Sequence, residues 1–267
     1  MNIGINGFGR IGRLALRNII QQKGLNIVAI NDLFPAEYLA YLLKYDSTHG
    51  KLNADISYDS KHIIINDKKI RVSCEKDPSK IKWGDVGADY IIESSGFFLT
   101  QELCKKHIEC GAKKVVMSAP PKDNTPMYVM GVNHNDYDES FNIVSNASCT
   151  TNCLAPIVEI LERHFGIENG VVSTIHAVTA SQNAIDSPNL KNWRLGRGAF
   201  QNIIPSTTGA ANAVGKILPK LKGKLTGMSF RVPTANVSIV DLSVNLKSET
   251  SYKEICSIMQ SESKSKR

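Results

Sequence analysis

The stretch N-I-G-I-N-G-F-G-R-I-G, residues 2–12, decides the fold of this 267-residue chain. Its first part, 2–6, is a short apolar run that stops at Gly7, and apolar residues then recur at helical spacing until Gly24. A second apolar run of strand length, LNIVAIND, follows at 25–32. This order of strand, helix and strand predicts a βαβ unit and therefore the beginning of a parallel sheet.

The same alternation continues along the first half of the chain. A helix is expected over 100–110, between strands on either side of it. The further expected strands are 62–66, 69–73, 89–94, 113–118, 127–132 and 141–146. We therefore predict an α/β fold in which residues 1–148 form a Rossmann-type, doubly wound parallel sheet.

The second half has a different pattern. A helix is expected from Cys149 to His164, ending at Gly166, with long strands at 170–176, 225–233 and 237–246. Between the first two of these strands, residues 177–198 read as a loop, and a loop of that length in a compact domain is usually functional. Residues 149–267 are therefore expected to form a separate α+β domain.

Composition limits the classes of protein to consider. No run approaches the eighteen or more apolar residues of a membrane-spanning helix, and no signal peptide is recognisable at the N-terminus. The six cysteines are too sparse for a disulfide framework, which favours a reducing compartment, and we expect a cytoplasmic protein. The net charge of +7 suits phosphorylated ligands, although most of it is expected to be solvated surface.

The glycines after the first strand match the dinucleotide-binding pattern G-x-G-x-x-G. Gly7 allows a tight turn, Gly9 lets a pyrophosphate approach the backbone, and Gly12 lets the helix pack close to the sheet. The helix N-terminus offers free N–H groups to the anion. Asp32, at the end of the second strand, can accept a hydrogen bond from a ribose 2′-hydroxyl and would repel a 2′-phosphate. The pattern therefore predicts NAD rather than NADP as the cofactor.

A candidate nucleophile lies where the two halves join. The segment SNASCTTN, residues 145–152, places Cys149 at the start of a helix, where the helix dipole favours a thiolate. His176 ends a strand and is the expected partner of this cysteine. Cys153 is interpreted as a small buried hydrophobe rather than as a resolving thiol. Cys104, His107 and Cys110 share one helix but lack a second ligand pair, so they are interpreted as packing and surface residues rather than as a zinc site.

Together these residues resemble the phosphorylating glyceraldehyde-3-phosphate dehydrogenase family. The resemblance covers nearly the whole chain. Its markers are INGFGRIGR, SNASCTTNCLAP, WR-x-GRG at 193–198, QNIIPS-x-TGAA, VGK-x-LP, LTGM-x-FRVPT and NVSIVDL.

The resemblance implies an activity and roles for individual residues. Cys149 and His176 would be catalytic, and glyceraldehyde 3-phosphate would be oxidised with NAD and inorganic phosphate to 1,3-bisphosphoglycerate, through a hemithioacetal and a thioester. The residues implied in binding the two phosphates are Ser148, Thr150, Thr179, Ser181, Thr208, Gly209 and Arg231. The residues implied in binding NAD are Asn6, Gly7, Gly9, Arg10, Ile11, Asp32, Ser95, Gly96 and Ser118. Pro188 in the long loop matches NAD-specific members, in which that loop lines a neighbouring subunit's cofactor pocket, so a homotetramer is implied. No metal and no membrane contact are expected.

The chain departs from the family at its end, because family members continue past the segment YKEICSIMQS with further strands of the catalytic sheet and a last helix. We therefore expect an incomplete catalytic domain with an exposed sheet edge and exposed apolar surface. Two other functional interpretations remain at this point. One is a catalytically impaired family member or a basic RNA-binding protein, and the other is a relative that acts on erythrose 4-phosphate.

Overall fold

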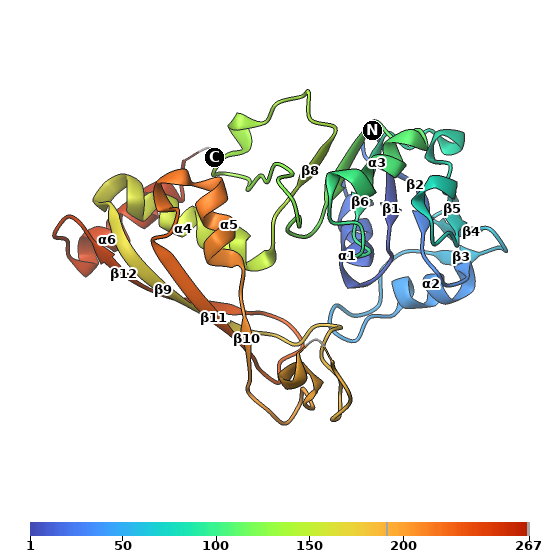
Figure 1. Cartoon of the computed structure of the whole chain (residues 1–267). Coiled ribbons are helices and arrows are strands. Elements are labelled where there is room, and N and C mark those ends of the chain that lie inside the picture. Colours follow the sequence, from blue (N-terminus) through green and yellow to red (C-terminus); the bar gives the residue numbers. More distant parts are fainter. Residues whose placement is uncertain (191, 266–267) are drawn as a thin grey trace. The chain divides into compact units, whose positions relative to one another are not determined.

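The computed structural model describes residues 1–190 and 192–265 and divides into two compact units (Figure 1). The first unit comprises residues 1–127 and 138–147, and the second comprises residues 128–137 and 148–267. Residues 128–137, which the sequence analysis assigned to the first domain, thus group with the second unit. Lys191, part of the predicted long loop, lies outside the described residues, as do Lys266 and Arg267.

The first unit is built on an eight-stranded sheet in the order β3-β4-β5-β2-β1-β6-β7-β8. Its strands are β1 (Asn2–Asn6), β2 (Asn26–Asn31), β3 (Ile56–Tyr58), β4 (His62–Ile65), β5 (Lys68–Ser73), β6 (Tyr90–Glu93), β7 (Lys114–Met117) and β8 (Ile143–Ser145). The six strands from β5 to β8 in this order run parallel, and β3 and β4 extend the sheet antiparallel at one edge. The predicted parallel sheet is therefore confirmed, with two antiparallel strands added.

Apolar clusters lie on both faces of this sheet, as a doubly wound fold requires. One cluster contains Leu16 of α1 (Arg10–Ile19) and Leu39 of α2 (Ala36–Lys44). The other contains Trp83 and Cys104, the latter on α3 (Gln101–Glu109). The Rossmann-type prediction is confirmed by this arrangement.

Glycines bring α1 close to β1. A Cβ atom on Gly12 would lie 2.2 Å from the carbonyl oxygen of Gly7, so only glycine fits there without a shift of the backbone. Gly7 itself has a φ of +86°, which side chains of L-residues rarely adopt. Gly9 differs from both, because a Cβ there would meet nothing within 4 Å.

The strand predicted over 127–132 is wrong. Only an isolated bridge joins Met127 to Ser145, and the chain turns at Gly131, which has a φ of +80°. The side-chain oxygen of Asn133 accepts the N–H of Val129 at 2.8 Å. A local side chain therefore satisfies a backbone donor that a strand would have paired across a sheet.

The second unit holds a four-stranded sheet in the order β10-β11-β9-β12 (Figure 1). Its strands are β9 (Ile167–His176), β10 (Ile204–Thr207), β11 (Leu225–Arg231) and β12 (Ile239–Leu246). Helices α4 (Cys149–Phe165) and α5 (Ala210–Ile217) pack against each other and against this sheet, and α6 (Tyr252–Glu262) follows β12. The short 3₁₀ helices of the whole chain are η1 (Pro78–Lys80), η2 (Trp83–Val86), η3 (His134–Asp136), η4 (Trp193–Gly196) and η5 (Pro219–Leu221).

The strand β12 lies at the edge of the sheet among the described residues. Exposed and half-buried residues alternate along it, and Ile239 is 62% exposed. The predicted exposed edge and exposed apolar surface are therefore present in the second unit. No helix in the described part of the chain has the length and apolar character that crossing a membrane requires.

The close approach at Gly12 gives a stability prediction. We expect Gly12→Ala to lower the free energy of unfolding by about 2 kcal/mol, because the added methyl group overlaps the Gly7 carbonyl oxygen. Gly9→Ala is the matched control, since Gly9 has an ordinary φ of −69° and open space around it. Urea unfolding of both variants measures the difference, and equal stabilities would show that α1 can move away from β1 without cost.

Candidate active site

The start of α4 carries the candidate nucleophile. Ser148 is the N-cap residue of α4, and its hydroxyl oxygen accepts the backbone N–H of Thr151 at 3.1 Å. The side chain of Asn152 donates to the carbonyl oxygen of Ser148 at 2.9 Å. These bonds fix the first turn, so Cys149 is held at the first helical position, where the backbone N–H lacks an acceptor within the helix.

Cys149 and His176 are brought together, as the sequence suggested. The Cys149 Sγ atom lies 3.4 Å from His176 Nε2, and Cys149 is solvent-exposed. The hydrogen bond from His176 lowers the pKa of Cys149 to about 7, against an opposing effect of partial desolvation. The hydroxyl of Thr150, 3.9 Å from the sulfur, acts in the same direction as His176. A large fraction of Cys149 is therefore a thiolate near neutral pH.

The other ring nitrogen of His176 has two competing partners. Arg231 Nη1 lies 2.5 Å from His176 Nδ1, and the carbonyl oxygen of Ala177 lies 2.7 Å from the same atom. A guanidinium has only donors, so when it donates to Nδ1 the proton of a neutral ring must be on Nε2, facing the sulfur. The bonds to Cys149 and to the Ala177 carbonyl raise the pKa of His176, against the opposing effects of burial and of the Arg231 charge. Arg231 therefore favours the neutral tautomer whose N–H points at the thiolate.

Strand register explains why these residues meet. In the parallel pair β9 and β11, His176 lies opposite Arg231, each at the end of its strand. Arg231 also donates to the Ala177 carbonyl at 3.1 Å, and its buried Nε has no hydrogen-bond partner among the described residues. The guanidinium is thus fixed through Nη1, which contacts both His176 and Ala177.

The predicted phosphate-binding residues fall into separate groups. Thr179 and Ser181 are together, with their hydroxyl oxygens 2.9 Å apart. Thr208 and Gly209 lie at the start of α5, beyond the end of β10, whereas the opposite end of β10 is paired with Arg231. The structure thus brings Arg231 to the catalytic pair directly but does not join Thr208 to it by any described hydrogen bond.

A cavity of about 620 Å³ lies at the carboxyl ends of the central strands of the first unit. This is the edge at which doubly wound sheets bind ligands. Five predicted cofactor residues line it, namely Asn6, Gly7, Gly9, Asp32 and Ser95. The volume is within the usual range of ligand-binding cavities.

The lining of this cavity suits a dinucleotide. The open space around Gly9 leaves room for a pyrophosphate at the start of α1, where helix N–H groups are free. The two carboxylate oxygens of Asp32 accept the N–H groups of Phe8, at 2.6 Å, and Leu33, at 2.7 Å. Each oxygen keeps a further lone pair for a ribose hydroxyl. Apolar side chains, including Phe34 and Phe98, complete the wall against which a base can lie.

The remaining predicted cofactor residues lie outside the lining of this cavity. Arg10 and Ile11 form the first turn of α1, and the Arg10 side chain is paired with Asp46. Gly96 follows Ser95 with a φ of +78°. Ser118 follows β7, and its N–H donates to the Glu93 carbonyl at 2.9 Å. All of these residues are at helix starts or strand ends.

Sequence reasoning missed Glu93, whose carboxylate is buried beside the cavity and bonded to Asn6 and Ser95. The available signal was an acidic residue at the end of an otherwise apolar strand.

The interpretation of Cys153 as buried is wrong, because Cys153 is exposed. On α4 the buried positions include Thr151, Leu154 and Ala155, so Cys153 lies on the opposite side of the helix.

Comparison with known proteins gives consistent matches. Residues 1–101 match the family model described as "Glyceraldehyde 3-phosphate dehydrogenase, NAD binding domain", and residues 148–267 match "Glyceraldehyde 3-phosphate dehydrogenase, C-terminal domain". The chain is 57% identical over 255 residues to glyceraldehyde-3-phosphate dehydrogenase of Salmonella typhimurium, which covers 96% of this chain and 77% of the relative. It is 55% identical over 260 residues to the cytosolic glyceraldehyde-3-phosphate dehydrogenase of Leishmania mexicana, which covers 97% of this chain and 78% of the relative. It is 56% identical over 255 residues to glyceraldehyde-3-phosphate dehydrogenase A of Escherichia coli K12. This match covers 96% of this chain and 77% of the relative.

The contact between Cys149 and His176 gives a pH prediction. We expect the rate of Cys149 alkylation by iodoacetamide to rise with pH around a midpoint near 7, because the thiolate is present above that pKa. His176→Asn removes the main cause of the lowered pKa, so its midpoint should move up toward the ordinary thiol value of ~8.5. The Cys149→Ser variant is the control, because its alkylation rate measures the reaction of the other free cysteines with iodoacetamide. An unchanged midpoint in the His176 variant would mean that another group stabilises the thiolate.

Proposed function

The chain belongs to the glyceraldehyde 3-phosphate dehydrogenase family, and we propose that it oxidises glyceraldehyde 3-phosphate to 1,3-bisphosphoglycerate with NAD and inorganic phosphate. The observation that carries this proposal is the exposed Cys149 sulfur, 3.4 Å from His176 Nε2 at the start of a helix. A thiol with a pKa of about 7 is a nucleophile at neutral pH, as acyl transfer through a thioester requires.

The first step proposed is attack of the Cys149 thiolate on the aldehyde carbon. A carbon–sulfur bond forms, and the carbonyl oxygen becomes the alkoxide of a hemithioacetal. Two donors are available for this oxygen, namely His176 Nε2–H and the backbone N–H of Cys149, which has no acceptor within the helix. Donors that are fixed before charge develops are an effective form of electrostatic catalysis.

Bound NAD supplies a hydride acceptor. When the hemithioacetal carbon loses hydride, the C–O bond becomes a carbonyl and Cys149 holds a thioester. An oxygen of inorganic phosphate then attacks the thioester carbon, the carbon–sulfur bond breaks, and Cys149 returns as a thiolate. The product is an acyl phosphate. Throughout these steps Arg231 keeps His176 in the tautomer that donates toward the sulfur.

We assign two anion sites to the remaining residues. Thr179 and Ser181, with adjacent hydroxyls, and Arg231 bind the substrate phosphate. Ser148, Thr150, Thr208, Gly209 and again Arg231 serve the attacking phosphate. Arginine offers bidentate donors to phosphate, while hydroxyl and backbone N–H groups add directional bonds.

The NAD site is assigned to the first unit. The assigned residues are Asn6, Gly7, Gly9, Arg10, Ile11, Asp32, Ser95, Gly96 and Ser118. Residues 1–148 act as the cofactor domain in this proposal, and 149–267 as the catalytic domain.

The proposal also includes a homotetramer and a cytoplasmic location. The homotetramer rests on the long loop that contains Pro188, which resembles an intersubunit loop. The cytoplasmic location rests on the similarity to a cytosolic relative.

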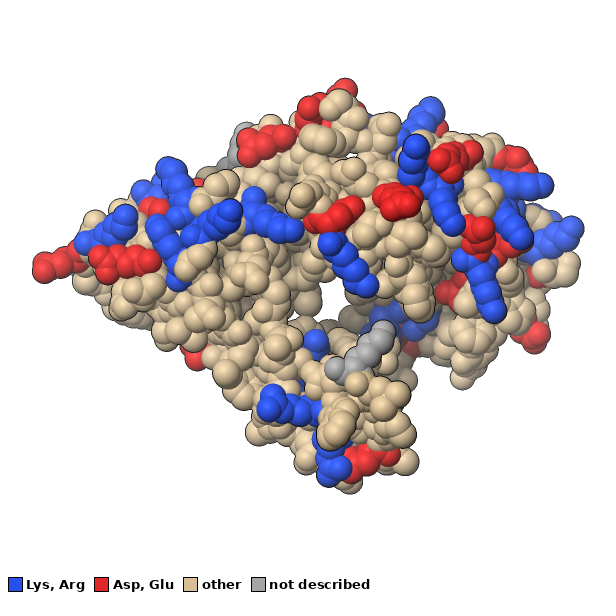
Figure 2. Space-filling model, viewed as in Figure 1, with Lys and Arg blue, Asp and Glu red and all other residues tan. Residues whose placement is uncertain are grey.

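Two alternatives have less support. The names of the relatives favour the triose phosphate over erythrose 4-phosphate. For RNA binding, a continuous basic surface would be needed, since phosphate contacts dominate such affinity. Figure 2 shows lysines and arginines interspersed with acidic side chains on the face that it presents.

The function is tested by NADH formation. We expect NADH to appear when glyceraldehyde 3-phosphate, NAD and inorganic phosphate are added together, with little turnover beyond one equivalent without phosphate. Cys149→Ser should abolish the reaction, because no thioester can form. His176→Asn should lower kcat by about 100-fold or more, as the loss of an acid–base group does. NADH formation in Cys149→Ser, or none from the folded unsubstituted protein, would refute the proposal.

A further inference from the structure

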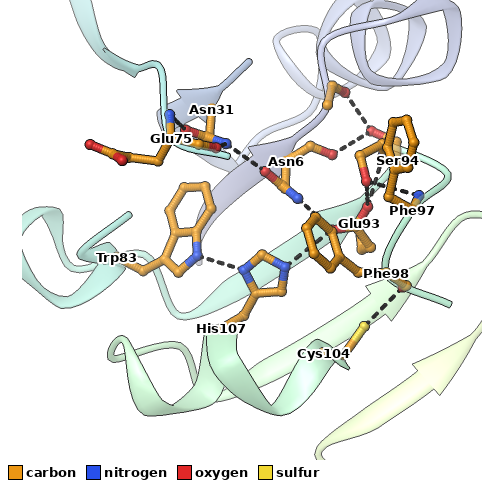
Figure 3. A network of polar contacts seen from close by, with 12 residues as sticks. Asn6, Asn31, Glu75, Trp83, Glu93, Ser94, Phe97, Phe98, Cys104 and His107 are labelled. Atoms are coloured by element: carbon orange, nitrogen blue, oxygen red, sulfur yellow. Dashed lines mark hydrogen bonds and ion pairs between the residues drawn. The ribbon is translucent and has the colours of Figure 1, made fainter. Parts of the chain in front are cut away.

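Six polar side chains, five of them buried and one partly buried, form a row at the carboxyl ends of the strands in the first unit. We call this row, Ser73, Asn31, Asn6, Glu93, His107 and Trp83, the polar belt. It runs from β5 across β2, β1 and β6 to α3 and η2, and Figure 3 shows it from Asn31 to Trp83. Glu93 is 1% exposed and His107 and Trp83 are completely buried, although the functions assigned above use neither Glu93 nor His107.

The protonation state of His107 follows from its partners. The indole N–H of Trp83 points at His107 Nδ1 at 3.0 Å, and an indole nitrogen can only donate. His107 Nδ1 must therefore be the accepting nitrogen, and the ring proton is on Nε2. That N–H donates to Glu93 Oε2 at 3.1 Å. His107 is thus a neutral imidazole that presents a donor to Glu93.

Among the described residues, four groups that can donate surround the Glu93 carboxyl group. Oε2 accepts the Asn6 amide at 2.6 Å as well as His107, and Oε1 accepts both the N–H, at 2.8 Å, and the hydroxyl, at 2.5 Å, of Ser95. The Ser95 oxygen also accepts the N–H of Phe97 at 3.2 Å. Of these four groups only the Ser95 hydroxyl could accept a proton from Glu93, because the other three are N–H donors. As a carboxylate, the buried Glu93 side chain accepts from all four donors.

The belt also fixes the orientation of the Asn6 amide. Its Nδ2 donates to Glu93, and its Oδ1 accepts from Asn31 at 2.8 Å, so a flip of the amide would place two donors against each other. Asn31 in turn accepts the N–H of Glu75 and donates to the Glu75 carbonyl, both at 2.9 Å. Asn6, Asn31, Glu75 and Ser95 all line the cavity of about 620 Å³.

We propose that Glu93 is a positioning residue for NAD, which sets Asn6 and Ser95 at the floor of the cofactor cavity through its buried carboxylate. The inference rests on the proposed NAD-binding function of this cavity. Glu93 acts through its neighbours, whereas Asn6 and Ser95 touch the cofactor. His107 and Trp83 keep the carboxylate in place from the side away from the cavity.

Glu93→Gln tests this role at nearly constant volume. The new amide must turn its NH₂ group either toward the two donors of Ser95 or toward those of Asn6 and His107, so at least one cavity residue loses its partner. We expect the Kd for NAD, measured by titration calorimetry, to rise about tenfold, which corresponds to about 1.4 kcal/mol. The KM for NAD should rise in parallel, while the KM for glyceraldehyde 3-phosphate should stay within about twofold.

The control is Ile91→Val on the same strand. Ile91 is completely buried in an apolar cluster and makes no contact with the belt through polar atoms. This substitution should lower the melting temperature by removing one methylene from the core, without changing the Kd for NAD. A similar rise of Kd in both variants would show that cofactor affinity merely follows the stability of the unit, and would overturn the proposal.

A double-mutant cycle with Asn6→Ala separates positioning from a general effect. If Glu93 acts through Asn6, the effect of Glu93→Gln on the Kd should be at least twofold smaller in the Asn6→Ala background. Additive effects, or an unchanged Kd in Glu93→Gln, would overturn the proposal. Glu93→Asp keeps the charge but withdraws the oxygens, so it should also weaken NAD binding and serves if the glutamine variant does not fold. If the unsubstituted protein binds no NAD, the proposed function itself fails, which this titration reveals before any variant is measured.

Discussion

The nucleotide-binding end of the molecule depends on one steric constraint, the absence of a side chain at Gly12. Because the first turn of α1 can lie against the carbonyl of Gly7, the helix N-terminus meets the carboxyl end of β1. The cavity forms at that edge, between the glycine turn, Asp32 and the end of β6. Close packing also confines polar side chains such as Asn6 below the cavity, where each must find a hydrogen-bond partner inside the protein.

Two histidines in different units have similar surroundings, His107 in the first unit and His176 in the second. In each ring, Nδ1 faces a donor that cannot accept, the indole of Trp83 for His107 and the guanidinium of Arg231 for His176. These donors favour a proton on Nε2, which points at an anion, although His176 Nδ1 also lies 2.7 Å from the Ala177 carbonyl oxygen. For His107 the anion is a buried carboxylate and the bond is structural. For His176 the anion is the exposed thiolate of Cys149, and the bond helps to make the sulfur nucleophilic.

Local sequence patterns predicted the features that depend on a few adjacent residues. The spacing of glycines and apolar residues predicted the glycine turn, the start of α4 at Cys149 and the strand that ends at His176. The pairing of Cys149 with His176 was also predicted, but other contacts between distant residues were missed. The pairing of Arg231 with His176 arises from strand register, which spacing does not specify. The failed strand at 127–132 reflects one asparagine side chain that competes for a backbone donor.

The position of β9 in the middle of its sheet has a consequence for folding during synthesis. Both of its partners, β11 and β12, come later in the chain, after the long loop and α5. Sheets that pair distant segments form slowly, and N-terminal segments emerge first from the ribosome. A newly made chain therefore carries β9 as an unpaired apolar strand for some time, and His176 at its end acquires its partner Arg231 only when β11 docks. The chemistry of the nucleophile is among the last properties that the nascent protein gains.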